Sequence, residues 1–314
     1  MGHLAWGMGG LLVCAGAVQA QVQVVTAARV HTSDPARPVA EAVAWDAQGR
    51  ILAVGGAREL LERYPGAKRT DAAGKTVIPG LIDAHGHVMG LGYALMRADL
   101  VDAHDKAEVS ARLRAFEKQL PPNAWLLGGG WDQNDWPEKT FPTAADLDAA
   151  FPDRPVWLER VDGHAGWANS AALRAVASNA TRSMDGEWQP EGGRIERIDG
   201  KPSGVFVDAA MSLVNAVVPA PDASYRRQAL EKARQAAVRN GVTGVDDMGV
   251  SREDLALMKQ FADENRLPLR TDAYADGDGA TLADLCAQGP YRHASGRLQM
   301  TGVKLYADGA LGSR

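Results

Sequence analysis

Residues 76–89 read T-V-I-P-G-L-I-D-A-H-G-H-V-M, and this stretch decides how the rest of the chain is interpreted. It begins as an apolar, β-branched run, which predicts a strand over 77–84. Because side chains alternate between the faces of a strand, His85 and His87 are expected to point to the same side. Gly86 between them lets the backbone approach whatever the imidazoles hold. Two neutral imidazoles make half of a metal site, although ordinary structural hydrogen bonds are the commoner explanation of such a bare pair.

Composition places the chain among globular proteins with a substantial core. It has 314 residues, of which 46% are hydrophobic and 23% charged. The net charge of −5 and the absence of a basic patch argue against nucleic acid as a partner. Several of the eight tryptophans fall in turn-rich segments, where they more often line pockets or cover hydrophobic edges than stack on bases.

The first 20 residues are typical of a signal peptide. An apolar, glycine-rich run over 4–18 leads to V-Q-A before Gln21, a small-x-small cleavage pattern. The n-region lacks lysine and arginine, and the run is too short for a comfortable membrane-spanning helix. We therefore expect a periplasmic or secreted protein with no membrane attachment after cleavage. Cleavage would leave Cys286 as the one cysteine, so no internal disulfide is expected.

The first 120 residues read as strands, turns and one clear helix. Residues 21–76 predict a small β unit, with a hairpin over 42–54 that turns at 46–49. After the strand over 77–84, an amphipathic helix is expected over 105–120.

The middle of the chain differs from the remainder. Residues 121–222 look like a long irregular insertion with two short strand candidates. From residue 224 onward, strands and helices alternate as βαβ units require, which predicts a parallel sheet. The expected segments are a helix over 224–240, a strand over 242–246, a helix opened by Ser251, and strands over 267–275 and 299–307.

Lys304 lies in T-G-V-K-L-Y-A-D-G, near the end of the last expected strand. Burying an ammonium group is costly, so a lysine at this position requires a partner or a function. Three interpretations remain open: a salt bridge to an aspartate, a Schiff base, or a carbamate that bridges two metal ions. The sequence by itself slightly favours the salt bridge.

Several motifs resemble one enzyme superfamily. P-G-L-I-D-A-H-G-H resembles the first-strand signature of the amidohydrolases. The segments G-G-G-W-D-Q, D-G-H-A-G-W-A-N-S-A-A-L, G-V-T-G-V-D-D-M-G and V-K-L-Y-A-D-G-A-L-G-S-R resemble the amidohydrolase-3 branch, which includes N-substituted formamide deformylases. The likeness extends over residues 22–314. It implies a metal-dependent hydrolase on an α/β fold, a TIM-like (β/α)8 barrel, with a small β-sandwich made from both chain ends.

The resemblance also assigns residues. It implies that His85 and His87 are metal ligands and that Lys304 is a carbamylated ligand bridging the metals. The family pattern further needs two histidines from strands 5 and 6 and an aspartate from strand 8, whereas four barrel strands are counted here. We therefore expect an N-terminal piece of a longer protein. Residues 21–76 would supply part of the sandwich and 77–314 the first half of the barrel, with an incomplete metal site and no activity by itself.

Residues of the insertion are candidates for contacts with substrate. His164 in D-G-H-A-G-W is predicted to be catalytic, as a substrate contact or oxyanion stabiliser, while a hydrogen bond that orders the loop is equally compatible. Trp131, Asp132 and Gln133 are predicted to bind substrate, or simply to fold the insertion. Asp83 is expected to support the histidines and not to bind the metal.

The predicted function is hydrolysis of a non-peptide carbon–nitrogen, amide-like bond in a small molecule by metal-activated water. The cofactor is expected to be one or two divalent ions, with zinc favoured, and a homo-oligomer is compatible with the sequence. One alternative is an exported, non-catalytic binding protein with a tryptophan-rich ligand platform. Another is a glycosidase with paired carboxylates, which ranks third because it gives His85, His87 and Lys304 no role.

Overall fold

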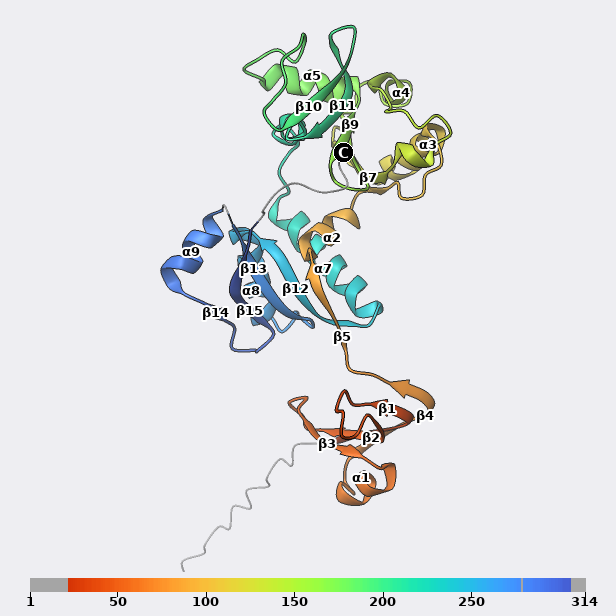
Figure 1. Ribbon diagram of the computed structural model, residues 1–314, viewed down its shortest axis with the longest axis vertical. Coiled ribbons are helices and arrows are strands. Elements are labelled where there is room, and N and C mark those ends of the chain that lie inside the picture. The colour runs from red at the N-terminus through yellow and green to blue at the C-terminus, as the bar shows by residue number, and fades with distance from the viewer. Residues whose placement is uncertain (1–21, 278, 306–314) are drawn as a thin grey trace, which may run out of the picture. The chain divides into compact units, whose positions relative to one another are not determined.

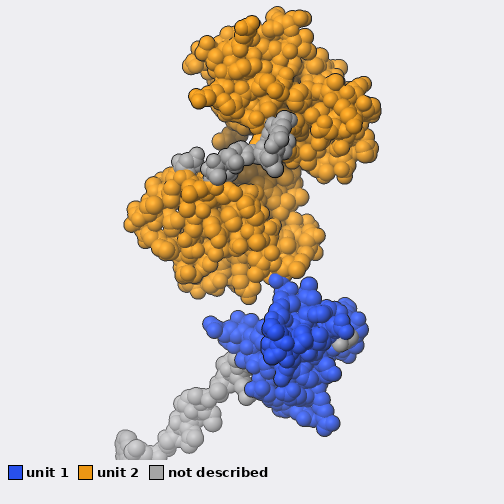
Figure 2. Space-filling model, in the orientation of Figure 1, with its two compact units in different colours: residues 1–80 blue, residues 81–314 orange. Residues whose placement is uncertain are grey.

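The chain forms two compact units, residues 1–80 and 81–314, which Figure 2 colours separately. This computed structural model describes residues 22–277 and 279–305. The predicted signal peptide over residues 1–20 and the end of the strand predicted over 299–307 lie outside the described residues. No helix in the described part of the chain combines the length and apolar character needed to cross a membrane.

The first unit is a four-stranded sheet with one helix (Figure 1). The order is β3-β2-β1-β4; β1 runs antiparallel to β2 and parallel to β4. The predicted hairpin is confirmed, because the Asp46 carboxylate accepts hydrogen bonds from the backbone N–H groups of Gln48 and Arg50 at its turn. The sandwich itself stays a prediction. The elements are β1 (Gln23–His31), β2 (Val39–Trp45), β3 (Ile51–Gly55), α1 (Ala57–Arg63) and β4 (Lys68–Val77).

The second unit contains the predicted parallel sheet. Four strands are hydrogen-bonded side by side in chain order, all parallel, and a two-residue strand closes one edge. The mixed α/β character is therefore confirmed, and completion of the sheet into a barrel stays a prediction. The strands are β5 (Leu81–Gly86), β12 (Val242–Val250), β13 (Arg270–Asp276), β15 (Leu298–Lys304) and the short β14 (Tyr291–Arg292).

Helices pack on this sheet through a core that includes Met258 and Phe261. The predicted helix ends are confirmed: Gly241, at φ +77°, follows α7, and the Ser251 hydroxyl accepts the Asp254 N–H at the start of α8. A Cβ at Gly92 would lie 2.3 Å from the carbonyl oxygen of Ala229, so α2 and α7 pack backbone against backbone. The helices are α2 (Val88–Ala94), α7 (Ala223–Arg239), α8 (Arg252–Asp263) and α9 (Ala280–Gln288).

The prediction that residues 121–222 are irregular is wrong, although its two strand candidates are confirmed as β7 and β8; that the segment is an insertion stays a prediction. Residues 98–215, called the insertion below, contain a six-stranded sheet ordered β10-β11-β9-β8-β7-β6, whose first strand precedes residue 121. The helix predicted over 105–120 is confirmed and lies in sequence between the first two strands of this sheet. The alternation of apolar and polar residues that signals a strand is missing because both faces of the sheet are covered. All four residues of β9, for example, are buried. The strands are β6 (Ala98–Asp99), β7 (Leu126–Trp131), β8 (Val156–Arg160), β9 (Ala165–Ala168), β10 (Gly193–Ile198) and β11 (Lys201–Asp208).

The insertion has two hydrophobic cores. One contains Trp131, Trp136 and Trp167, whose ring centroids lie 5.8–6.0 Å apart, together with side chains of α3 and α4. The other contains Trp157 and Phe206 with side chains of α5 and α6. The helical elements are α3 (Lys106–Glu117), η1 (Gln133–Asp135), α4 (Ala144–Asp148), α5 (Ser170–Asn179) and α6 (Met211–Asn215).

Candidate functional site

The parallel sheet brings His85 and Lys304 together. Nζ of Lys304 lies 3.4 Å from Nε2 of His85, although β12 and β13 separate their strands. Adjacent strands lie about 4.8 Å apart, so a flat sheet would place β5 and β15 about 14 Å apart. The side chains of Lys304 and His85 therefore meet across the two strands that lie between them.

His87 is oriented by the neighbouring strand. Its Nδ1 lies 3.0 Å from the carbonyl oxygen of Met248 on β12, and a carbonyl can only accept, so Nδ1 carries the proton. Nε2 of the neutral ring is then left with a free lone pair. A metal-binding histidine commonly donates its other N–H to a carbonyl or carboxylate in this way. The centroids of the His85 and His87 rings lie 5.6 Å apart.

Gly86, which lies between the two histidines in the sequence, has no space for a side chain. A Cβ at this position would lie 2.7 Å from Cγ2 of Val245 and 3.3 Å from Oδ2 of Asp83. Asp83 also accepts the backbone N–H of His85 at 3.1 Å. Asp83 therefore supports the backbone that carries the imidazole.

The sequence predicted no role for Asp247, which lies on β12. Its side chain is buried, with the residue 3% exposed, and Oδ1 accepts the Val88 N–H at 2.9 Å. Oδ2 has no hydrogen-bond partner in the described part of the chain. Burial raises the pKa of this carboxyl to about 6, while the Val88 N–H and the charge of His87 act in the opposite direction. The D-D pair at the end of the strand expected over 242–246 was the available signal. In the structure β12 continues past this pair to Val250.

A second group of polar residues lies at one end of the insertion sheet. Nδ1 of His164, in the turn between β8 and β9, lies 2.8 Å from Oδ1 of Asp208 at the end of β11. Asp162 in the same turn accepts from the His164 backbone N–H and from Arg160. The sequence missed Asp208, which lies 44 residues from His164.

Residues 69–314 match the amidohydrolase family. The chain belongs to this family. It is 34% identical over 302 residues to the protein LONG AFTER FAR-RED 3 of Arabidopsis thaliana, covering 92% of this chain and 50% of that protein. It is 32% identical over 262 residues to an N-substituted formamide deformylase of Arthrobacter pascens, covering 80% and 47%. The chain thus spans about half the length of these relatives.

A solved structure supports the same assignment. An uncharacterized metal-dependent hydrolase from Pyrococcus horikoshii matches with a TM-score of 0.70 and 25% identity, covering 94% of this chain and 56% of that one. The predicted resemblance to the amidohydrolase-3 branch is therefore confirmed.

The described residues of this amidohydrolase fit part of a metal centre. His85 and His87 offer two imidazole nitrogens, and Lys304 would offer oxygen ligands once carbamylated. No group of three or more His, Cys, Asp or Glu side chains that could hold a metal occurs within residues 22–277 and 279–305. The unpartnered Oδ2 of Asp247, whose register partner is Gly86, provides a further polar atom on this part of the sheet.

The G-G-G-W-D-Q segment of the amidohydrolase is anchored inside the insertion. Trp131 is fully buried and its indole N–H donates to the carbonyl of Leu158, so it presents no surface to a ligand in this structure. Asp132 accepts the Asn134 N–H at the start of η1. Gln133 is 9% exposed, and its Oε1 has no hydrogen-bond partner among the described residues. Substrate binding by these three residues stays a prediction.

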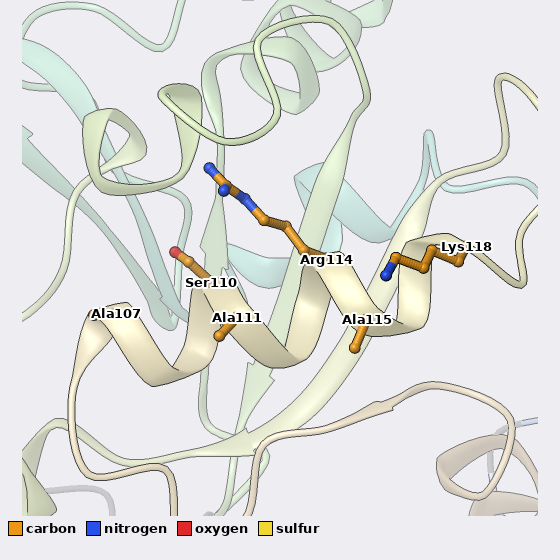
Figure 3. A pocket seen from close by; sticks show the side chains of 6 residues that line it. All are labelled: Ala107, Ser110, Ala111, Arg114, Ala115 and Lys118. Atoms are coloured by element: carbon orange, nitrogen blue, oxygen red, sulfur yellow. The ribbon is translucent and has the colours of Figure 1, made fainter.

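A hollow on the outer side of α3 is separate from all of these residues. Figure 3 shows its lining of small side chains with Arg114 and Lys118, all from one stretch of helix and the residue that follows it. None of the predicted site residues contributes to it. The hollow therefore lies apart from the strand-end group of His85, His87 and Lys304.

Proposed function

We propose that this amidohydrolase belongs to an enzyme that hydrolyses a non-peptide carbon–nitrogen bond in a small, amide-like substrate. The observation that carries the proposal is the 3.4 Å approach of Lys304 Nζ to His85 Nε2, with His87 oriented beside it. The relative named N-substituted formamide deformylase supports the bond type. The metal-dependent hydrolase among the solved structures supports the need for a metal.

The proposed roles follow from the donor atoms. A divalent ion, with zinc favoured by the imidazole ligands, would supply Lewis acidity and lower the pKa of a water molecule. His85 and His87 would hold it through Nε2, and a carbamate on Lys304 would allow one or two ions to bind. His164 would contact the substrate, with Asp132 and Gln133 lining its path. We infer that a complete centre needs more ligands than the described residues provide.

The same proposal includes export. The apolar run and the V-Q-A pattern before Gln21 support a signal peptide and a periplasmic or secreted protein. N-terminal sequencing of the mature protein tests this directly. An unprocessed terminus at Met1 in an exporting host would contradict it.

The central experiment replaces His85 and His87 by alanine, singly, in the intact protein. We expect metal content, measured by elemental analysis, and amide hydrolysis to be lost together. His293→Ala is the control, because that imidazole bonds Asp263 and Ser295 and lies apart from the strand-end group. Unchanged metal content and turnover in the His85 and His87 variants would contradict the proposal.

The rival function, a tryptophan-rich ligand platform, would have to use tryptophans other than Trp131, Trp136 and Trp167. Trp131, Trp136 and Trp167 are buried against one another in a core and do not form an exposed surface. Their indole N–H groups are satisfied by backbone carbonyls. Trp125 and Trp188 are half-buried, so these are the rings of the insertion that such a platform would have to use.

A further inference from the structure

The contact between His164 and Asp208 joins two separate segments at the same end of the insertion sheet. Besides the 2.8 Å contact of Nδ1 with Oδ1, the Asp208 N–H donates to the His164 carbonyl at 2.9 Å. Asp208 has φ +50°, a backbone conformation uncommon for residues other than glycine. The fold therefore holds this carboxylate beside the imidazole at two points.

The turn that carries His164 is also held. Oδ1 of Asp162 accepts the His164 backbone N–H at 3.0 Å and the Arg160 Nε–H at 2.8 Å. Gly163, at φ +74°, permits the tight turn, in which its own N–H donates to the Arg160 carbonyl. Backbone and ring of His164 are thus fixed independently, as expected of a group that must point in one direction.

The carboxylate decides which ring nitrogen carries the proton. An ionised carboxylate only accepts hydrogen bonds, so Nδ1 of His164 must donate. Nε2 of the neutral ring is then an acceptor, and among the described residues it has no hydrogen-bond partner. The His164 side chain is 31% exposed, so Nε2 remains within reach of a ligand.

We propose that Asp208 is a positioning residue that holds His164 in the Nδ1–H tautomer, so that Nε2 accepts a hydrogen bond from an N–H group of the substrate. This inference rests on the proposed function and narrows its substrate to primary and secondary amides. A neutral ring in this tautomer has no proton on Nε2 to offer an oxyanion. His164 would therefore recognise the amide nitrogen and not the carbonyl oxygen.

Tautomer measurement by NMR tests the positioning role without any need for activity. In the intact protein labelled with ¹⁵N-histidine, we expect His164 to carry its proton on Nδ1. The His164 resonance is assigned as the one that disappears in the His164→Gln variant. In Asp208→Asn the amide can donate to Nδ1, so the Nε2–H form should increase. Asp263→Asn, which alters the other His–Asp contact at His293, should leave His164 unchanged. A wild-type His164 protonated on Nε2 would overturn the proposal.

Kinetics test the substrate class. The metal-loaded intact protein should hydrolyse a secondary amide with a kcat/KM about 10-fold or more above that of its N-methylated, tertiary counterpart. This ratio should fall toward one in His164→Ala and in Asp208→Asn, and Asp208→Glu should partly restore it. A ratio that stays unchanged in variants whose circular dichroism matches that of the wild type would overturn the inference.

The NMR and kinetic experiments distinguish a failure of the proposed function from a failure of the inference about His164. If the metal-loaded protein hydrolyses neither amide, the proposed function fails and the NMR result alone decides the role of Asp208. If both amides are hydrolysed with equal efficiency, the proposed function stands and the inference about the amide N–H is overturned.

Discussion

Lys304 Nζ and His85 Nε2 lie 3.4 Å apart across a sheet in which two strands separate them. Their distance in sequence is 219 residues. The contact therefore depends on the pairing of all four parallel strands and not on any local turn.

Carbon dioxide should control metal binding through Lys304. We expect bicarbonate to increase the metal affinity of the wild-type protein, because a carbamate adds anionic oxygen ligands to two imidazoles. Lys304→Met should abolish this response. Lys259→Met is the matched control, since that ammonium lies over the Tyr291 ring. Titration calorimetry with and without bicarbonate measures the difference, and an equal response in wild type and Lys304→Met would contradict carbamylation.

Gly86→Ala should destabilise the second unit by about 1–3 kcal/mol, because the new Cβ would collide with Val245. Gly129→Ala is the control, since a Cβ there would meet its nearest atom at an ordinary 3.6 Å. Urea unfolding followed by circular dichroism measures both. In a Val245→Ala background the cost of Gly86→Ala should shrink, and an undiminished cost would show that the collision is not its cause.

Asp146 should stabilise the insertion only while it is charged. Burial raises the pKa of this carboxyl, but hydrogen bonds from Thr143 and Lys106 outweigh it, so the net pKa is lowered. Because the pKa in the folded state lies below that in the unfolded state, the ionised carboxylate stabilises the fold at pH values above the unfolded pKa, near 3.8. This stabilisation is lost as the pH falls through the folded pKa. Asp146→Asn should therefore cost about 1 kcal/mol at pH 7 and progressively less below pH 4.

The control for Asp146 is Asp153→Asn, an exposed carboxylate in the same insertion. It should change the free energy of unfolding little at either pH. Unfolding in urea at pH 7 and pH 3 gives the comparison. A pH-independent cost for Asp146→Asn would contradict the electrostatic explanation.

Asn169 satisfies four backbone groups inside the insertion. Its side-chain oxygen accepts from Val156 and Ala172, and its amide donates to Phe151 and Arg154. Asn169→Ala leaves these buried groups unpaired and should cost about 3 kcal/mol or more.

Asn179→Ala is the control for this position, since that exposed side chain donates only to the Ala175 carbonyl within α5. Hydrogen exchange of the insertion amides should reveal the loss in Asn169→Ala. Equal protection in the two variants would show that the buried network contributes little to stability.

Local signals explain what the sequence predicted well. The turn at Asp46, the Ser251 cap and the Gly241 stop are each encoded within a few residues, and all are confirmed. The parallel sheet followed from strands and helices that alternate over many residues. Here His85 and Lys304 were assigned by family likeness, and the structure places them together.

Non-local features explain what was missed. The strand β9 has four residues, all buried, and β6 has two, so neither shows a readable alternation. The partner of His164 lies on another strand, and no local pattern marks Asp208. The orientation of His87 depends on a backbone carbonyl, which has no sequence signature. These relationships exist only once the sheets have formed.

Tryptophan fluorescence reports on only one part of the second unit. Six of the eight tryptophans lie within residues 98–208, and none lies in 81–97 or 209–314. Intrinsic fluorescence of the second unit therefore reports on the insertion, while the sheet that carries His85, His87 and Lys304 is silent in this signal. A fluorescence melt that departs from the far-ultraviolet dichroism melt would reveal that these two parts of one chain lose their structure at different temperatures.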